Sequence, residues 1–336
     1  MIVVLGDINV DISARLDAPP RLGSDCLAPE LGLHLGGVGA NTAIALARLG
    51  EPVRLIACTG RDWFAEFALE RLAREGVDLS FVQRTADALT GVMFIAIAPD
   101  GQRTILGSRS ANLLLRPDQE MKRALEGARA LHLMGYSQMV LALEEAATTL
   151  LREARERKLP VSVDAGAAPS HQIPEKVVAL GAKADLFFAN AEEAAALTGK
   201  DHPRAALEAL EKSGILQAIL KLGESGCVLR QDSALVEVPP LPVRAVDTTG
   251  AGDSFTAAFL KARLDGWSDD EAALFANAAG AAASEIVGAA DGMPDPARLR
   301  AIISRSPLPG PWEDVRRRVL DRLQQEVNAT PKPEGA

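Results

Sequence analysis

A glycine-rich turn in the C-terminal third of the sequence carries an acid that could act as a base. The segment reads Asp247-Thr248-Thr249-Gly250-Ala251-Gly252-Asp253-Ser254-Phe255, and residues 256–264 after it are typical of a helix. Free N–H groups at a helix N-terminus favour an anion such as phosphate. An aspartate beside a bound phosphoryl group makes chemical sense if Asp253 removes the proton of an attacking hydroxyl. The alternative is an ordinary turn that Asp253 caps.

A second glycine cluster, Gly36-Gly37-Val38-Gly39-Ala40-Asn41, also leads into a predicted helix, residues 41–49. Adjacent glycines allow close approach of the backbone to a ligand, and the Asn41 amide offers a donor and an acceptor for hydroxyl groups. The alternative is a loop-to-helix turn with Asn41 as its cap. The glycine spacing differs from the dinucleotide-binding fingerprint, and no GxxxxGK[ST] segment is present, which excludes a P-loop kinase.

Short apolar runs between alanine-rich stretches indicate which elements must position these turns. Strands are predicted at residues 2–5, 53–57, 131–134, 161–164, 186–189 and 219–222, and helices at 41–49, 63–75, 143–158, 192–197 and 203–212. Strands that alternate with helices predict an α/β fold with a mainly parallel sheet covered on both faces. The nearly all-apolar strands fit burial on both sides.

Two segments interrupt this alternation. Residues 13–35 contain prolines, glycines and short alternating runs, and residues 90–106 read as two strands, 92–98 and 103–106, around a Pro99-Asp100-Gly101 turn. They could be two exposed loops. We expect instead that they pair into a small β-sheet that projects over the active site as a lid.

Composition excludes several functional classes. The 336 residues are 48% hydrophobic and 24% charged, as in a folded soluble protein, and the net charge of -9 argues against a general nucleic-acid binder. Cysteines at 26, 58 and 227 and four isolated histidines form neither a disulfide framework nor a zinc pattern. Without a signal peptide or a membrane-length apolar window, we expect a cytoplasmic protein with no membrane or nucleic-acid partner.

Beyond a cluster of prolines at 307, 309 and 311, the chain changes character. Residues 312–327 place Val315, Val319, Leu323 and Val327 on one stripe, which predicts an amphipathic helix that packs on the domain or on a partner subunit. Residues 306–336 therefore form a separate C-terminal segment, whose end, 328–336, is expected to be disordered.

The two glycine-rich segments, in this order, resemble the signatures of the ribokinase or phosphofructokinase-B family of carbohydrate kinases. Three further segments are similar to that family: Gly6-Asp7-Ile8-Asn9-Val10-Asp11 to its first strand end, Asn190-Ala191-Glu192-Glu193 to its NxxE motif, and Lys221-Leu222-Gly223-Glu224-Ser225-Gly226 to its nucleotide-side turn. The resemblance covers residues 1–305. It implies a ribokinase-like three-layer α/β/α fold, with a large part from residues 1–11, 36–87 and 111–305 and a lid from about 12–35 and 88–110.

The resemblance also implies roles for individual residues. Asp253 would be the catalytic base, and Gly250, Ala251 and Gly252 would form the anion hole. Glu193 would hold Mg²⁺ through water. ATP would contact Asn190, Lys221, Gly223, Gly226 and Asn277. A K⁺ ion would lie among Asp247, Thr249, Ala283, Ile286 and Gly288, although Gly292 replaces a residue that is often a serine in ribokinases. On the nucleotide side, Lys221 replaces a residue that is often a threonine; this lysine could reach a phosphate group or could equally be a surface charge.

The predicted activity is transfer of the γ-phosphate of ATP to a hydroxyl of a small sugar or sugar acid. In such kinases the sugar would contact Asn9, Asp11, Gly37, Asn41 and Tyr136. Val38 replaces the usual lysine, Tyr136 lies where a carboxylate is common, and Arg103 and Arg109 suit an acidic sugar such as a 2-keto-3-deoxy acid. The alternatives are a nucleoside kinase, with the base against Phe94, and a non-catalytic sugar-binding relative. Small lids of this family often pair between subunits, and an exposed sheet edge needs a cover, so the resemblance implies a homodimer.

Overall fold

A large, mainly parallel sheet forms the centre of the molecule. The computed structural model describes residues 1–18, 21, 23, 25–98, 103–118, 120–231 and 234–329. The strands of the sheet are β1 (Ile2–Leu5), β4 (Val53–Thr59), β5 (Asp78–Arg84), β8 (Ala130–Met134), β9 (Val161–Asp164), β10 (Leu186–Asn190), β11 (Ala218–Lys221), β12 (Cys227–Gln231) and β13 (Ala234–Val238). Among the described residues, their order is β13-β12-β11-β10-β9-β8-β1-β4-β5; the pairs β11–β12 and β12–β13 are antiparallel, and the other pairs are parallel.

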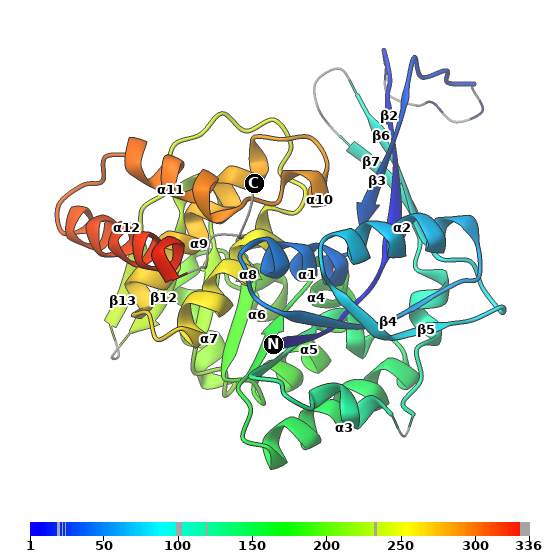
Figure 1. Cartoon of the computed structure of the whole chain (residues 1–336), viewed down its shortest axis with the longest axis horizontal. Coiled ribbons are helices and arrows are strands. Elements are labelled where there is room, and N and C mark those ends of the chain that lie inside the picture. Colours follow the sequence, from blue (N-terminus) through cyan, green and yellow to red (C-terminus); the bar gives the residue numbers. More distant parts are fainter. Residues whose placement is uncertain are drawn as a thin grey trace.

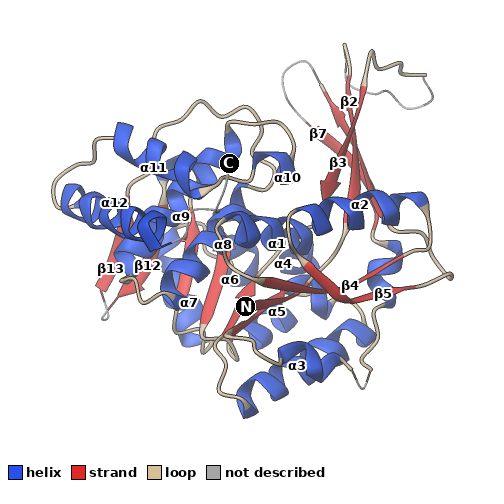
Figure 2. Cartoon of the chain, in the orientation of Figure 1, coloured by secondary structure: helices blue, strands red, loops and turns tan. Residues whose placement is uncertain are grey.

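Helices cover both faces of this sheet (Figure 2). Alternate strand residues face opposite ways: Phe187 packs into one core, whereas Phe188 packs into another. The first core includes side chains of α3 (Leu141–Glu156), α5 (Pro174–Gly181), α6 (Ala191–Thr198) and α7 (Pro203–Lys212), with α4 (Ala167–Gln172) beside α6. The opposite face is covered by α1 (Val38–Arg48), α2 (Trp63–Arg74), α8 (Ala251–Leu264), α9 (Asp269–Ser284), α10 (Ala289–Gly292) and α11 (Pro296–Arg305). The predicted three-layer α/β/α fold is confirmed.

A second, four-stranded sheet projects from the large part of the molecule and forms the lid (Figure 1). Its strands are β2 (Asn9–Arg15), β3 (Leu31–Gly36), β6 (Gly91–Ile97) and β7 (Arg103–Ser108), in the order β3-β2-β6-β7. The β2–β6 pair is parallel and the other two pairs are antiparallel. The predicted lid is confirmed, although β2 begins at Asn9 rather than near residue 12. The predicted turn at residues 99–101 lies outside the described residues.

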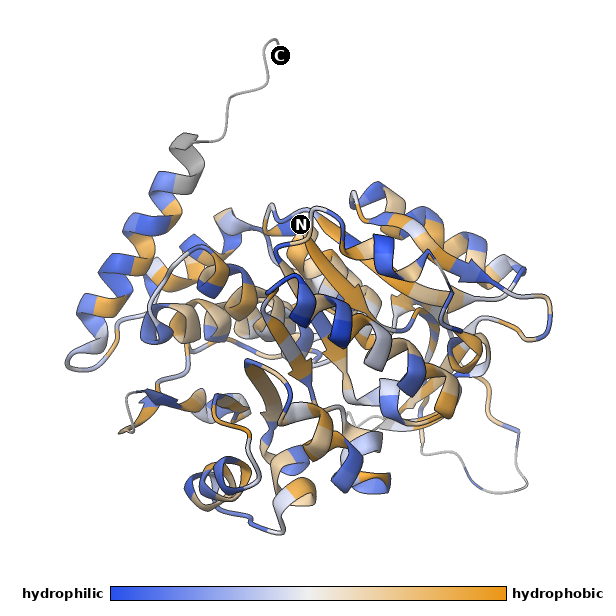
Figure 3. Ribbon diagram, turned by 90° about the horizontal axis from the view of Figure 1, so that it is seen from below, coloured by the Kyte–Doolittle hydropathy of each residue, from blue (hydrophilic) through white to orange (hydrophobic). Residues whose placement is uncertain are grey.

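Helix α12 (Trp312–Ala329) packs on the same chain, against α9 and α11. Val315, Val319 and Leu323 are buried in the core that α9 also lines, and Arg318 Nε donates to Glu271 Oε1 of α9 at 2.7 Å. Figure 3 shows hydrophilic and hydrophobic residues alternating along this helix at the edge of the molecule. The helix extends two residues beyond the point at which the disordered end was expected to begin, and residues 330–336 lie outside the described residues.

Candidate active site

The two glycine-rich segments meet at the N-termini of α1 and α8. Each helix follows a glycine with positive φ, Gly37 at 98° and Gly250 at 80°, a conformation that other residues rarely adopt. Asn41 and Asp253 therefore lie in the first turns of their helices instead of capping them. Asn41 Nδ2 donates to Asp253 Oδ2 at 2.8 Å, which joins positions 212 residues apart.

Asp253 has the electrostatic environment of a base that works near neutral pH. Burial raises the pKa of Asp253 to about 7, and the charges of Asp164 and Asp7 add to the rise, whereas the Asn41 hydrogen bond and Lys221 oppose it. A carboxyl group with this pKa accepts a proton readily at neutral pH and still exists largely as the carboxylate slightly above it. In the turn before it, the Ala251 amide donates to the Thr248 carbonyl at 3.2 Å.

Asp7, which the sequence analysis did not assign to the site, organises the segment that carries Asn9. Its Oδ1 accepts from the Gly39 amide at 3.0 Å, and its Oδ2 contacts Arg109 Nη1 at 2.9 Å and Asn9 Nδ2 at 3.3 Å. Asn112, also missed, donates to Asn9 Oδ1 at 2.8 Å. A carboxylate two residues after the end of a buried strand was the available signal for Asp7.

Two buried acceptor atoms lie unpartnered on the sugar side of the candidate site. Among the described residues, Asp11 Oδ1 and Asn41 Oδ1 have no hydrogen-bond partner. Buried polar atoms of this kind are normally satisfied, and the hydroxyl groups of a ligand would satisfy these. Burial, helped by Asp7, raises the pKa of Asp11 to about 7, although His34 lowers it. A Cβ atom on Gly36 would lie 2.3 Å from both carboxylate oxygens of Asp11, so the carboxylate requires glycine there.

A cavity separates the inner face of the lid from the large part of the molecule. Asp11 lines it from the lid, together with His34 and Ile95, whereas Asp247 and Gly288 line it from the opposite side. The Asp11 carboxylate thus faces an opening rather than a packed core.

Tyr136 lines a small cavity together with Asp7 and Arg109. The Arg109 guanidinium stacks over the Tyr136 ring, 3.4 Å from its centroid, while it also binds Asp7. The next residue, Ser110, has a φ of 44°, a strained value for a serine. Arg109 is therefore held in one place by a carboxylate, an aromatic face and a constrained backbone.

Lys221, Asp164 and Glu193 gather where β9, β10 and β11 end. Lys221 Nζ lies 2.7 Å from Asp164 Oδ2, and the same carboxylate accepts from Thr256 Oγ1 of α8 at 2.9 Å. Asn190 and Glu193 form a capping box at the start of α6, with two hydrogen bonds of 2.8 Å. Burial, and then the nearby Asp164 charge, raise the pKa of Glu193 to about 7. The sequence analysis missed Asp164.

The other predicted nucleotide contacts cluster beyond β11. A Cβ atom on Gly226 would lie 2.1 Å from the Val238 carbonyl oxygen, so the backbone passes closely there. Asn277 Nδ2 donates to the carbonyl oxygens of Val238 and Pro239 at 3.3 and 3.0 Å. Gly223 opens the turn between Lys221 and Gly226. Asn277 thus holds the loop after β13 beside this turn.

The predicted K⁺ ligands come together around Asp247. Its Oδ1 accepts from the amide and hydroxyl of Thr249 at 3.0 and 2.7 Å, and its Oδ2 accepts from the Gly288 amide at 3.0 Å. A Cβ atom on Gly292 would lie 2.7 Å from the Ala283 carbonyl oxygen and 3.5 Å from that of Ile286. In the described part of the chain, no three His, Cys, Asp or Glu side chains form a metal cluster.

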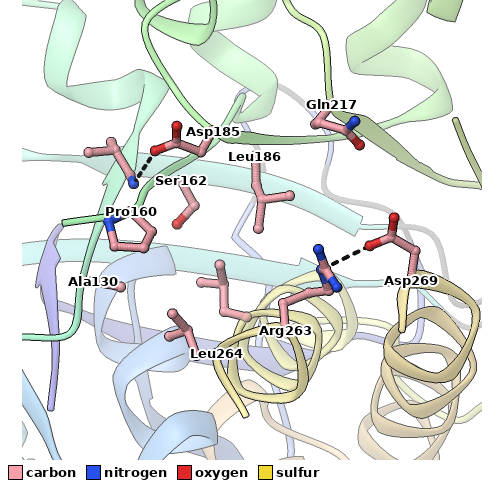
Figure 4. Close-up of a pocket in the computed structure, with 11 residues that line it drawn as sticks. Ala130, Pro160, Ser162, Asp185, Leu186, Gln217, Arg263, Leu264 and Asp269 are labelled. Carbon is pink, nitrogen blue, oxygen red and sulfur yellow. Dashed lines mark hydrogen bonds and ion pairs between the residues drawn. The ribbon is translucent and has the colours of Figure 1, made fainter. Parts of the chain in front are cut away.

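A separate cavity of about 330 Å³ lies at the opposite, amino-terminal edge of the sheet (Figure 4). It is lined by the starts of β8 to β11 and by the C-terminal end of α8, far along that helix from Asp253. Its charged groups are paired within the protein: Arg263 with Asp269, and Asp185 with the Val161 amide. The candidate active site is therefore assigned to the carboxyl edge of the central sheet and not to this cavity.

Comparison with known proteins identifies the family of the chain. Residues 1–296 match the model of the pfkB family of carbohydrate kinases. The chain belongs to this family. A deoxyribokinase of Salmonella typhi is 31% identical over 264 residues, which cover 77% of this chain and 84% of the relative. This pfkB-family chain is thus an ATP-dependent carbohydrate kinase.

Solved structures agree with this assignment. The ribokinase of Arabidopsis thaliana, solved with ribose and ATP, is 27% identical and has a TM-score of 0.80, with 90% of this chain and 97% of the other covered. An adenosine kinase of Sinorhizobium meliloti, 23% identical with a TM-score of 0.77 over 86% of this chain and 94% of the other, shares the fold. In the part of the chain that the structure describes, no helix has the length and apolar character needed to cross a membrane.

Proposed function

We propose that this kinase phosphorylates a small neutral sugar of the pentose class, with Asp253 as the general base. The hydroxyl oxygen of the sugar attacks the γ-phosphorus of ATP while its proton passes to the Asp253 carboxylate. The bond from the γ-phosphorus to the bridging oxygen breaks, and its electron pair leaves with ADP. Asn9, Asp11, Gly37 and Asn41 would position the sugar, with Tyr136 behind them.

The hydrogen bond between Asn41 and Asp253 is the observation that carries this proposal. It places the residue expected to bind a sugar hydroxyl in contact with the residue expected to accept the proton. The amides of Gly250, Ala251 and Gly252 belong to the same turn, so a phosphoryl group held there would lie beside the base. The Ala251 amide would exchange its 3.2 Å contact with Thr248 for a phosphate oxygen.

The contacts of Arg109 favour a neutral sugar as the substrate over a sugar acid. Its guanidinium is already bound to Asp7 and stacked on Tyr136, so its charge is compensated before a substrate arrives. Asp11 and Asp253 make the surroundings of the sugar site acidic, which would repel a carboxylate of the substrate. The similarity to a deoxyribokinase and to ribokinases agrees with a neutral pentose.

Two cations would complete the site. Glu193 fits a role in holding Mg²⁺ through water, because its buried carboxyl group lies beside the strand ends where the phosphates would bind. Mg²⁺ would neutralise phosphate charge there. The nucleotide would contact Asn190, Lys221, Gly223, Gly226 and the loop that Asn277 holds.

We also propose a K⁺ site at the Asp247 loop. The carbonyl oxygens of Ala283 and Ile286 approach the same point beside Gly292, which suits a cation held by carbonyl groups. Asp247 would supply the formal charge, and Thr249 and Gly288 are tied directly to it.

The outer face of the lid supports a homodimer. Ile12, Leu33, Phe94 and Leu106 are neighbours in register across the four strands and therefore share one face. Phe94 is 38% and Leu106 68% exposed, and Leu31 on the same face is 60% exposed. An apolar sheet face of this kind would be covered by the lid of a second copy. The buried thiols of Cys58 and Cys227, which form no disulfide, and the use of ATP support a cytoplasmic location.

A substrate screen tests the proposed specificity. ADP release would be measured with ribose, 2-deoxyribose, fructose, a 2-keto-3-deoxy acid and adenosine at equal concentrations, with Mg²⁺ and K⁺ present. We expect the highest kcat/KM for a neutral pentose. A higher kcat/KM for the keto-deoxy acid or for adenosine would overturn the proposal in favour of a sugar-acid or nucleoside kinase.

A further inference from the structure

A buried ion pair lies next to the turn that carries the catalytic aspartate. Lys221 has a side chain that is 12% exposed, and its Nζ binds Asp164, whose side chain is 7% exposed. Asp164 is held in turn by Thr256, one turn after Asp253 on α8. The three side chains come from β11, β9 and α8, so the pair links two strand ends to the helix of the candidate base.

Stability alone gives a weak reason for this pair. Two charges lose their hydration when they are buried, and the attraction between them often only compensates that cost. An apolar pair of similar size would hold the strand ends together equally well. The position of the ammonium group points instead to a ligand.

The Lys221 ammonium faces the predicted anion hole. Its Nζ lies 3.4 Å from the point that a Cβ atom on Gly252 would occupy. Burial disfavours its charge, but Asp164, Glu193 and Asp253 together raise the pKa of Lys221, so it stays protonated among three acids. An ammonium group has three donors, and Asp164 uses one of them.

We propose that Lys221 is a catalytic residue that donates to the transferred phosphoryl group, and that Asp164 is the residue that positions it. The inference rests on the proposed function, and it assigns the predicted contact of Lys221 with ATP to the phosphoryl group that is transferred. While the hydroxyl proton passes to Asp253 and the bond to ADP breaks, Lys221 keeps its own proton and compensates negative charge on the phosphoryl oxygens. Asp164 prevents the flexible lysine from turning to Glu193 or Asp253.

The first test compares two nucleotides in the complete protein. For Lys221→Met, we expect the affinity for a non-hydrolysable ATP analogue with Mg²⁺ to fall at least about tenfold and that for ADP with Mg²⁺ by less than about threefold. We expect kcat to fall about 10²- to 10³-fold, as when one donor to a transition-state oxyanion is removed. Lys176→Met is the matched control, because Lys176 Nζ binds Glu144 at 2.7 Å on the surface. Equal losses for the two nucleotides, or a change in kcat below about threefold, would overturn the proposal.

The second test separates positioning from structural support. Asp164→Asn should lower kcat, and the double variant Asp164→Asn/Lys221→Met should match Lys221→Met within about threefold, because Asp164 acts through Lys221. A double variant whose loss in kcat equals the product of the two single-variant losses would contradict this role. The double variant removes both members of the buried ion pair, so neither is left without the other, and it keeps the test valid if a single variant does not fold. Absence of sugar phosphorylation in the wild type would refute the proposed function, whereas the nucleotide affinities would still decide the Lys221 contact.

Discussion

At the scale of single residues, Asp253 is the position where a minimal change should have the largest effect. Asp253→Asn keeps the size of the side chain but removes the proton acceptor, so kcat with the best sugar should fall at least about 10²-fold. The affinity for ADP should stay within about threefold of wild type, because the glycine turn before it is unchanged. Steady-state kinetics and calorimetric titration measure the two quantities. A variant with a near wild-type kcat would refute Asp253 as the base.

The raised pKa of Asp253 gives a second prediction at this scale, for the dependence of the rate on pH. The base must be deprotonated to accept the hydroxyl proton, and its pKa in the ligand-free enzyme is raised to about 7 by burial, with Asp164 and Asp7 adding to the rise. Therefore kcat/KM for the sugar should fall on the acid side of pH 7 by at least about tenfold per unit, because protonation of Asp253 alone gives tenfold and Asp11 titrates in the same range. A profile that stays flat down to pH 5 would contradict this assignment.

At the scale of elements, the sequence predicted what depends on local pattern and missed what depends on tertiary contacts. Six of the nine strands of the central sheet are buried apolar runs and were predicted, whereas β12 and β13, the antiparallel strands at one end of the sheet, were missed. Strand β5 was missed because it lies at the sheet edge and its residues are only partly buried. Helix α8 starts at Ala251, five residues earlier than expected, because glycine residues conceal a helical start. Asp7 and Asp164 were missed because their partners, Arg109 and Lys221, are 102 and 57 residues away.

Helix α12 lies after the residues that match the family model, so its contribution should be to stability rather than to catalysis. Leu323 is 1% exposed against α9, and Leu323→Ala should lower the free energy of unfolding by about 2–5 kcal/mol. The KM values for ATP and sugar should change less than about twofold. Arg317→Ala is the control, because Arg317 and Asp314 form an exposed pair of little value. Chemical denaturation measures the difference, and equal stability of the two variants would contradict the role of the helix.

At the scale of the whole molecule, the two faces of the lid have different chemistry. The inner face carries Asp11, His34 and Ile95 toward the cavity, whereas the outer face is apolar and exposed. One sheet can thus hold a sugar on one side and a second subunit on the other. Binding of a second lid would stabilise the strands that carry Asn9 and Asp11, so assembly and sugar affinity should be linked.

Substitutions at Leu106 and its neighbour Ile105 test directly whether the outer face of the lid, and not the inner face, forms the dimer interface. They are 68% and 58% exposed, but they lie on opposite faces of β7, Leu106 opposite Phe94 and Ile105 opposite Ile95. The wild type should sediment as a dimer of about 71 kDa, twice the chain mass of 35.4 kDa. Leu106→Lys places a charge in the proposed interface and should shift the protein to the monomer at micromolar concentration, with a raised KM for the sugar. Ile105→Lys adds the same charge to the other face and should leave the dimer intact. Dissociation by both substitutions, or by neither, would contradict an interface on the outer face of the lid.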